Sequence, residues 1–157
     1  MDVTIHAVAF EQKPVLWRLL QLYIYDFTEF EAMPMDASAE FEYRYFDEYW
    51  APVDGERRFP FFIRADGALA GFAMVRFVNG KYVMAEFFVM RRFRRGAIGR
   101  RAVKLVLAAL PGDWIIHEHP KNLVAQQFWP KVIAEVTGGP FEEEREDDGA
   151  LTQRFTV

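Results

Sequence analysis

The pattern of apolar residues in the first third of the chain predicts one strand and two helices. Residues 14–30 repeat apolar side chains every three or four positions, which predicts an amphipathic helix. Pro34 interrupts the pattern, because proline lacks the amide hydrogen that a helix interior needs. The stretch 37–50, rich in aromatic residues, is predicted as a second helix, with a strand as the alternative. Residues 2–9 are predicted as a first strand.

Three apolar runs in the middle of the chain are separated by turn signals. Residues 58–64, 68–77 and 81–90 are rich in branched and aromatic side chains, which favour strands. An Asp-Gly pair at 66–67 and an Asn-Gly pair at 79–80 lie between these runs. Both pairs are typical of two-residue hairpin turns, so the sequence predicts three consecutive antiparallel strands.

The last third alternates helical and extended patterns again. Helices are predicted over 99–110 and 122–136, with a short strand over 114–117 between them. The acidic run 142–148 leads into an Asp-Gly turn at 148–149. This run predicts a solvated hairpin that closes the chain.

The element order defines the predicted fold class. One mixed α/β domain is expected over residues 1–157, in the order β-α-α-β-β-β-α-β-α-β-β. Its sheet would be mainly antiparallel and six- to seven-stranded, with about four helices packed against it.

Composition agrees with one well-packed domain. The chain has 157 residues, of which 52% are hydrophobic and 17% aromatic, enough for a substantial core. It has no cysteine, which excludes disulfides, thiolate metal sites and cysteine nucleophiles. Residues 1–10 lack the pattern of a signal peptide, and no apolar run is long enough to cross a bilayer. We therefore expect a cytoplasmic protein that does not bind membranes.

Charge is distributed unevenly along the chain. The net charge of -4 disfavours a general nucleic-acid binder. Residues 1–55 hold eleven acids against three bases, whereas residues 91–104 hold seven bases and no acid. The first region favours a cationic partner and the second favours an anion.

The segment 91–101 has the features of an anion site. It follows an apolar strand and opens a helix, whose first amide groups lack partners within the helix. Gly96 allows a tight bend, and Gly99 lets a ligand approach the backbone. Cations at a helix N-terminus oppose the helix dipole unless an anion completes the site. The cations here are Arg94, Arg95, Arg100 and Arg101. The alternative is a basic, solvated helix end whose glycines serve only the turn.

Two segments resemble motifs of the GNAT acetyltransferase superfamily. Residues 94–99 read Arg-Arg-Gly-Ala-Ile-Gly, which is similar to that family's Gln/Arg-x-x-Gly-x-Gly/Ala at a helix start. Ala97 stands where the middle glycine is usual. Residues 122–129 read Asn-Leu-Val-Ala-Gln-Gln-Phe-Trp and resemble the family's Asn-x-x-Ala-x-x-Phe-Tyr. The element order of the whole chain is also similar to that of the family.

The resemblance implies an acyl-CoA N-acyltransferase fold that binds acetyl-CoA. In that fold the fourth and fifth strands diverge and pantetheine pairs with the edge of the fourth, here residues 87–89. The pyrophosphate would meet the amides of residues 95–100, and Asn122 would contact the pantetheine arm, or serve only as a helix cap. The implied cofactor-binding residues are Phe88, Val89, Arg94, Arg95, Gly96, Ala97, Ile98, Gly99, Arg100 and Asn122.

Glu86 is the candidate catalytic base, because it is the only acid in the apolar run 83–90. A carboxylate in such a strand is costly unless it is paired or solvated. Related enzymes often place a base on this strand. Alternation with period two would put Glu86 on one face with Tyr82, Met84 and Phe88. The alternative is a structural ion pair with an arginine.

The proton donor for the leaving thiolate is left open by the sequence. The family often uses the tyrosine of its second motif, where this chain has Trp129, and an indole N–H is not a useful acid. Candidate replacements are Tyr43, Tyr45 and Tyr82. A metal site at the His-Glu-His run of residues 117–119 is disfavoured, because no third ligand follows at helical spacing. One of these histidines could instead act as a base.

Together with these residues, the resemblance implies an N-acetyltransferase that passes an acetyl group from acetyl-CoA to a primary amine by direct attack in a ternary complex. The acceptor would be a small-molecule or peptide amine of cationic character, because the segment expected to line its site is acidic and aromatic. Its candidate residues are Tyr23, Tyr25, Asp26, Phe27, Glu29, Phe30, Glu31, Tyr43, Tyr45, Asp47 and Glu48. Two ordinary amphipathic helices would explain them equally well. The sequence also leaves open a non-catalytic acyl-CoA-binding module and an RNA-contacting protein. Trp50, expected to be exposed, would fit a homodimer.

Overall fold

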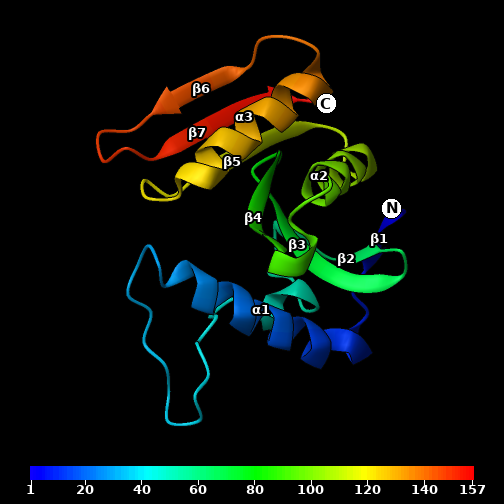
Figure 1. Cartoon of the computed structure of the whole chain (residues 1–157), viewed down its shortest axis with the longest axis vertical. Coiled ribbons are helices and arrows are strands. Elements are labelled where there is room, and N and C mark those ends of the chain that lie inside the picture. The colour runs from blue at the N-terminus through cyan, green and yellow to red at the C-terminus, as the bar shows by residue number, and fades with distance from the viewer.

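A computed structural model describes the whole chain, Met1–Val157. Seven strands form one sheet in the order β1-β2-β3-β4-β5-β7-β6 (Figure 1). Only the β4–β5 neighbours are parallel, so the predicted mixed, mainly antiparallel α/β fold is confirmed. The strands are β1 Val3–Ala7, β2 Glu56–Ala65, β3 Ala68–Val78, β4 Lys81–Val89, β5 Asp113–Glu118, β6 Glu142–Arg145 and β7 Leu151–Thr156.

Three α-helices pack on this sheet: α1 Lys13–Phe27, α2 Ile98–Ala109 and α3 Leu123–Thr137. In Figure 1, α1 and the long segment after it lie at one end of the molecule, and α3 with β5–β7 lies at the other. The strands β2–β4 and helix α2 lie between these ends.

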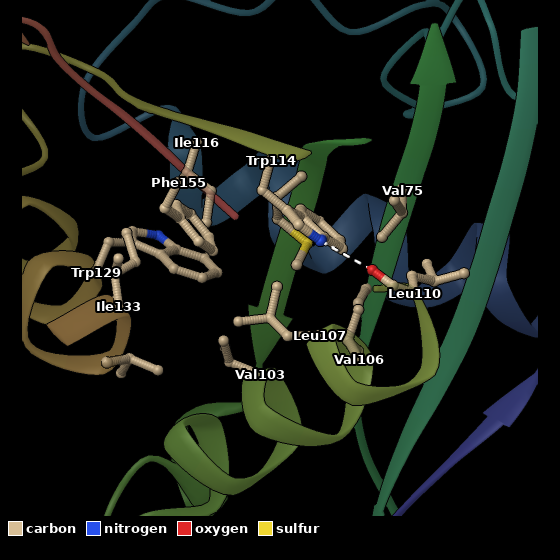
Figure 2. Close-up of a cluster of buried hydrophobic side chains, with 13 residues drawn as sticks. Val75, Val103, Val106, Leu107, Leu110, Trp114, Ile116, Trp129, Ile133 and Phe155 are labelled. Carbon is tan, nitrogen blue, oxygen red and sulfur yellow. Dashed lines mark hydrogen bonds between the residues drawn. The ribbon is translucent and has the colours of Figure 1, made fainter. Parts of the chain in front are cut away.

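The two faces of the sheet bury different clusters. Alternate side chains of β3 point to opposite faces, as the strand period requires. Phe72 and Met74 join the cluster under α1, and Ala73 and Val75 join the cluster under α2 and α3. Figure 2 shows that second cluster, in which the Trp114 indole donates a hydrogen bond of 3.0 Å to the Leu110 carbonyl.

A β-bulge in β4 changes which residues share a face. Met74 pairs with Glu86 and Val75 pairs with Met84, so Ala85 has no partner on β3. An extra residue of this kind reverses the alternation beyond it. Met84 faces the α2/α3 cluster, while Phe88 belongs to the α1 cluster. The predicted common face for Glu86, Tyr82 and Met84 is therefore wrong.

The predicted second helix over 37–50 is also wrong. The Asp36 carboxylate accepts hydrogen bonds from the Ser38 and Glu40 amides, at 2.7 and 3.1 Å, which closes a local turn that competes with helix. Gln21 of α1 holds both backbone groups of Phe41. Phe41, Phe46 and Tyr49 of the segment then join the buried cluster under α1, and only a short 3-10 turn forms at Asp47–Tyr49.

The closing hairpin is confirmed, since β6 pairs with β7 and all four β6 residues are exposed. The prediction that Trp50 is exposed is wrong. Trp50 packs in part against the α1 cluster and donates its indole N–H to the Val8 carbonyl at 2.9 Å. It does not form an exposed aromatic surface.

Candidate active site

A cleft of about 730 Å³ opens between α1, the end of β4, the start of α2 and helix α3. It exists because β4 and β5 pair only through Tyr82–Trp114 and Val83–Ile115. Beyond Val83 the two parallel strands separate, and β5 leaves that edge of β4 without a partner. An unpaired strand edge offers backbone donors and acceptors to an extended ligand. Phe88 and Val89, two predicted cofactor residues, line the cleft at this edge.

A bend of left-handed residues brings the start of α2 to the same cleft. Gly96 has φ of 99° and Ala97 has φ of 65°, and α2 begins at the next residue, Ile98. The Ala97 carbonyl accepts the Arg101 amide at 3.0 Å. The amides of the first helical turn have no carbonyl partner within the helix and are available to an anion. Ala97, Gly99 and Arg100 line the cleft.

Arg94 lines the cleft and joins the end of β4 to α1. Its Nε donates a hydrogen bond of 2.8 Å to the Val89 carbonyl, and its Nη2 lies 2.5 Å from Asp26 of α1. Arg91 binds the other oxygen of Asp26 at 2.6 Å. Burial alone would raise the pKa of Asp26, but the hydrogen bonds from Arg94 and Arg91 outweigh it and hold that pKa below its usual value. No pattern in the sequence indicates this contact, because its partners lie 68 positions apart.

The other arginines of the predicted cluster diverge. Arg100 pairs with Glu135 of α3 at 3.3 Å, and both residues border the cleft. Arg95 is exposed and makes no hydrogen bond within the chain. Arg101 turns away and donates to the Met1 carbonyl at 2.5 Å. Of the four arginines, Arg101 therefore does not direct its side chain to the cleft.

Asn122 lines the cleft from the opposite wall. Its Oδ1 accepts the Ala125 amide at 3.1 Å, so it caps α3 as the alternative interpretation requires. This cap leaves the side-chain amide free to donate to a ligand.

Glu86 lies on the α1 side of β4, next to two tyrosine hydroxyls. Tyr43 donates to it at 3.2 Å. Burial raises the pKa of Glu86 to about 7, although hydrogen bonds from Tyr23 and Tyr43 oppose the rise. Glu86 makes no ion pair, so the structural pair with an arginine is not formed. A carboxyl group that titrates near neutrality is suited to proton transfer.

Tyr23 of α1 lines the cleft and interacts with Glu86, which is not itself a lining residue. The Tyr23 ring packs against Phe72 and Phe88, at centroid distances of 5.7 and 5.8 Å. The sequence placed Tyr23 near the acceptor but missed its contact with Glu86. A detectable signal was present, since Tyr23 is the polar group within the otherwise apolar stripe of its helix.

The three candidate proton donors, Tyr43, Tyr45 and Tyr82, lie in different parts of the structure. Tyr82 stacks on Trp114 in the opposite cluster, and Tyr45 is exposed beside Arg44. Neither hydroxyl faces the cleft. The Tyr43 hydroxyl donates its hydrogen bond to Glu86. The Trp129 indole makes no hydrogen bond within the chain, and its ring packs edge-on against Phe87.

The acceptor segment is divided between the cleft and the rest of the surface. Tyr23, Asp26, Phe27, Glu29 and Phe30 line the cleft. The other six do not line it. Tyr25, Glu31 and Tyr45 are exposed, Tyr43 donates to Glu86, and Asp47 and Glu48 pair with Lys13 and Arg58.

The His-Glu-His run at the end of β5 does not converge on one point. His117 is exposed and lies 3.0 Å from the Thr152 hydroxyl. Glu118 is buried and accepts a hydrogen bond of 2.7 Å from Gln153. His119 packs against the rings of both Phe27 and Phe30, at centroid distances of 5.4 and 5.9 Å. His119 is thus the member of the run that adjoins the acceptor segment.

Comparison with protein families assigns most of the chain. The model of the acetyltransferase (GNAT) family matches residues 18–133. A search of curated protein sequences gave no significant match. None of the helices combines the length and the apolarity that crossing a membrane requires.

Solved acetyltransferase structures share the fold at low sequence identity. An acetyltransferase from Thermus thermophilus superposes with a TM-score of 0.72 at 14% identity, covering 100% of this chain and 98% of that one. PaiA N-acetyltransferase from Thermoplasma acidophilum, in complex with coenzyme A, gives 0.65 at 14% identity, with 100% of both chains covered. An aminoglycoside acetyltransferase in complex with coenzyme A gives 0.66 at 14%, covering 99% and 95%.

Proposed function

The chain belongs to the acetyltransferase (GNAT) family, and from this premise we propose that it transfers an acetyl group from acetyl-CoA to a primary amine. One observation carries the proposal: the unpaired edge of β4 and the free amides at the start of α2 open into the same cleft. A strand edge and a helix N-terminus are the two features that pantetheine and a pyrophosphate need. Two of the similar structures are complexes with coenzyme A, which supports this donor.

The cofactor would lie along this cleft. Pantetheine would pair with the backbone of Phe88 and Val89, and Asn122 would donate to it from α3. The pyrophosphate would bind the amides that follow the left-handed bend, with arginine charge beside it. The residues assigned to this part of the site are Arg94, Arg95, Gly96, Ala97, Ile98, Gly99 and Arg100.

Glu86 would act as the general base of a direct transfer in a ternary complex. Acetyl-CoA supplies the activated acyl group when it is bound. Glu86, with its pKa of about 7, accepts the proton that the attacking amine loses. Tyr23 lies between Glu86 and the cleft, so the proton would pass through its hydroxyl or through water.

The acceptor would be a cationic amine. The wall formed by α1 and the residues after it combines the Phe27 and Phe30 rings with the exposed carboxylate of Glu29. Aromatic faces and carboxylates both attract ammonium groups. A small molecule and a peptide or lysine amine both fit this description.

A second candidate function is a non-catalytic acyl-CoA-binding module. The observation that favours it is Trp129, which is 6% exposed and stands where the family often has a tyrosine acid. The module would use the same cleft without turnover.

Incubation with acetyl-CoA and a panel of amines, followed by titration of free thiol, tests the proposal. We expect thiol release that depends on both substrates. Coenzyme A binding without thiol release on any amine would favour the module. If coenzyme A changed neither the melting temperature nor the amide resonances of residues 94–101, both candidate functions would be wrong.

A further inference from the structure

Asp26 is the carboxylate that meets the anion site. It projects from α1 into the cleft, with its side chain 21% exposed, and each of its oxygens is bound by a different arginine of the loop before α2. These two pairs are the only ion pairs between α1 and the basic residues 91–101. The Asp26 pairs therefore link the proposed acceptor wall to the proposed cofactor loop.

The same contact occupies one acceptor of the otherwise unpaired strand edge, the Val89 carbonyl. While Arg94 is held by Asp26, its Nε–H occupies the Val89 carbonyl at 2.8 Å and its guanidinium lies 5.6 Å from the centre of the Phe88 ring. A ligand that pairs with β4 as an added strand needs that carbonyl. A ligand phosphate needs the arginine charge that the carboxylate now neutralises.

We propose that Asp26 is a latch that couples the two substrates of the enzyme, releasing Arg94 to the phosphates of acyl-CoA and offering its own carboxylate to the ammonium group of the acceptor. The inference rests on the proposed function. Each substrate must break the ion pair between Asp26 and Arg94. The substrate that binds first therefore removes the free-energy cost of breaking this pair for the second. Binding of either substrate then strengthens binding of the other by the same factor.

Removal of the latch has a counterintuitive result. Asp26→Asn leaves Arg94 free, so coenzyme A should bind more tightly, by about three- to tenfold for two partly exposed ion pairs. Inorganic pyrophosphate should gain in the same way, because the competition concerns charge. Both affinities are measured by isothermal titration calorimetry at fixed ionic strength.

Glu29→Gln is the matched control, because it removes one negative charge from the same cleft and Glu29 forms no ion pair. Its effect on coenzyme A binding should be less than about twofold, at the level of general screening between exposed charges. Equal tightening in both variants would show a net-charge effect and overturn the latch. Weaker binding in Asp26→Asn would show that Asp26 positions Arg94 for the phosphates, which also overturns it.

The coupling is tested with n-butylamine, a single ammonium group on a short apolar chain. Saturating n-butylamine should tighten coenzyme A binding in the wild type and leave Asp26→Asn unchanged. If n-butylamine changed coenzyme A binding equally in both proteins, or in neither, the proposed contact between Asp26 and the acceptor's ammonium group would be wrong. If the wild type bound no coenzyme A, the proposed function itself would fail, whereas binding that ignores Asp26 would remove only the latch.

Discussion

Glu86 has two properties that a base for amine chemistry needs. Its pKa of about 7 keeps it ionised in part at neutral pH and able to hold a proton once it gains one. It also interacts with the hydroxyl of Tyr23, a residue that lines the cleft. We therefore expect Glu86→Gln to lower kcat by about 100- to 10,000-fold while the affinity for coenzyme A stays close to the wild-type value.

The pH dependence separates a base from a structural residue. The ratio of wild-type to Glu86→Gln kcat/KM cancels the titration of the acceptor amine. This ratio should rise with pH, reach half of its plateau near pH 7, where Glu86 is half ionised, and level off about one pH unit higher. Glu42→Gln, an exposed change on the same side of the sheet, is the control. A ratio independent of pH would contradict the role of Glu86 as base.

Ala97 is a residue in a conformation that favours glycine. It has φ of 65° and ψ of 16° before the first turn of α2, which costs a residue with a Cβ about 1 to 2 kcal/mol. Ala97→Gly should raise the free energy of unfolding by about 1 kcal/mol in urea denaturation. Ala109→Gly, at the helical end of α2, should lower it by about 1 kcal/mol. Destabilisation by both changes would show that the bend is not strained.

Strands β3 and β4 approach each other more closely than a side chain allows. A Cβ on Gly71 would lie 2.0 Å from the Phe88 carbonyl oxygen, so the strand edge that borders the cleft would have to move. We expect Gly71→Ala to lower the free energy of unfolding by about 2 to 4 kcal/mol. Gly139→Ala meets nothing within 4 Å and should change it by less than about 0.5 kcal/mol. Similar values for the two variants in urea unfolding would contradict the close approach of β3 and β4.

The elements that could be predicted from the sequence are those with local causes. The hairpins at 66–67 and 79–80 follow from dipeptides that favour left-handed turns, and Asp66, Gly67, Asn79 and Gly80 all have positive φ. The false helix over 37–50 failed because its competitor is partly long-range: Gln21 binds the backbone of Phe41 from α1. The bulge at Ala85 had no local signal either.

The site was predictable to the same extent. The glycine bend and the start of α2 are contiguous in sequence, so the anion-binding amides could be expected. The contacts that set the chemistry are not contiguous. Asp26 on Arg94 and Tyr43 on Glu86 span 68 and 43 positions, and only the folded sheet brings them together.

The stability of the whole molecule depends on carboxyl groups on both faces of the sheet. Burial is the main cause that raises the pKa of Glu118 to about 7, with Glu143 adding to it and the Gln153 hydrogen bond opposing it. Glu118 is 2% exposed, and its Oε2 and the Oε1 of Gln153 are both buried acceptors without a donor. A proton on the carboxyl group supplies that donor. Glu86 has a raised pKa as well.

A raised carboxyl pKa fixes the sign of the effect. Between the unperturbed value of 4.5 and about 7, the folded protein holds a proton on Glu118 that the unfolded chain has released. The free energy of unfolding must therefore fall as the pH rises through this window, and the loss is complete above about 7. At 1.36 kcal/mol per pKa unit, Glu118 accounts for about 3 kcal/mol of the complete loss. Urea unfolding at pH 5 and pH 8 measures the difference.

Glu118→Gln removes the proton that causes this part of the pH dependence, while it keeps the size of the side chain. We expect the variant to lose roughly half of the wild-type decrease in stability between the two pH values, since Glu86 still contributes. Glu142→Gln, an exposed change on β6, should retain the full decrease. If Glu118→Gln retained it as well, Glu118 would be ionised in the folded protein and its buried oxygen would need another donor.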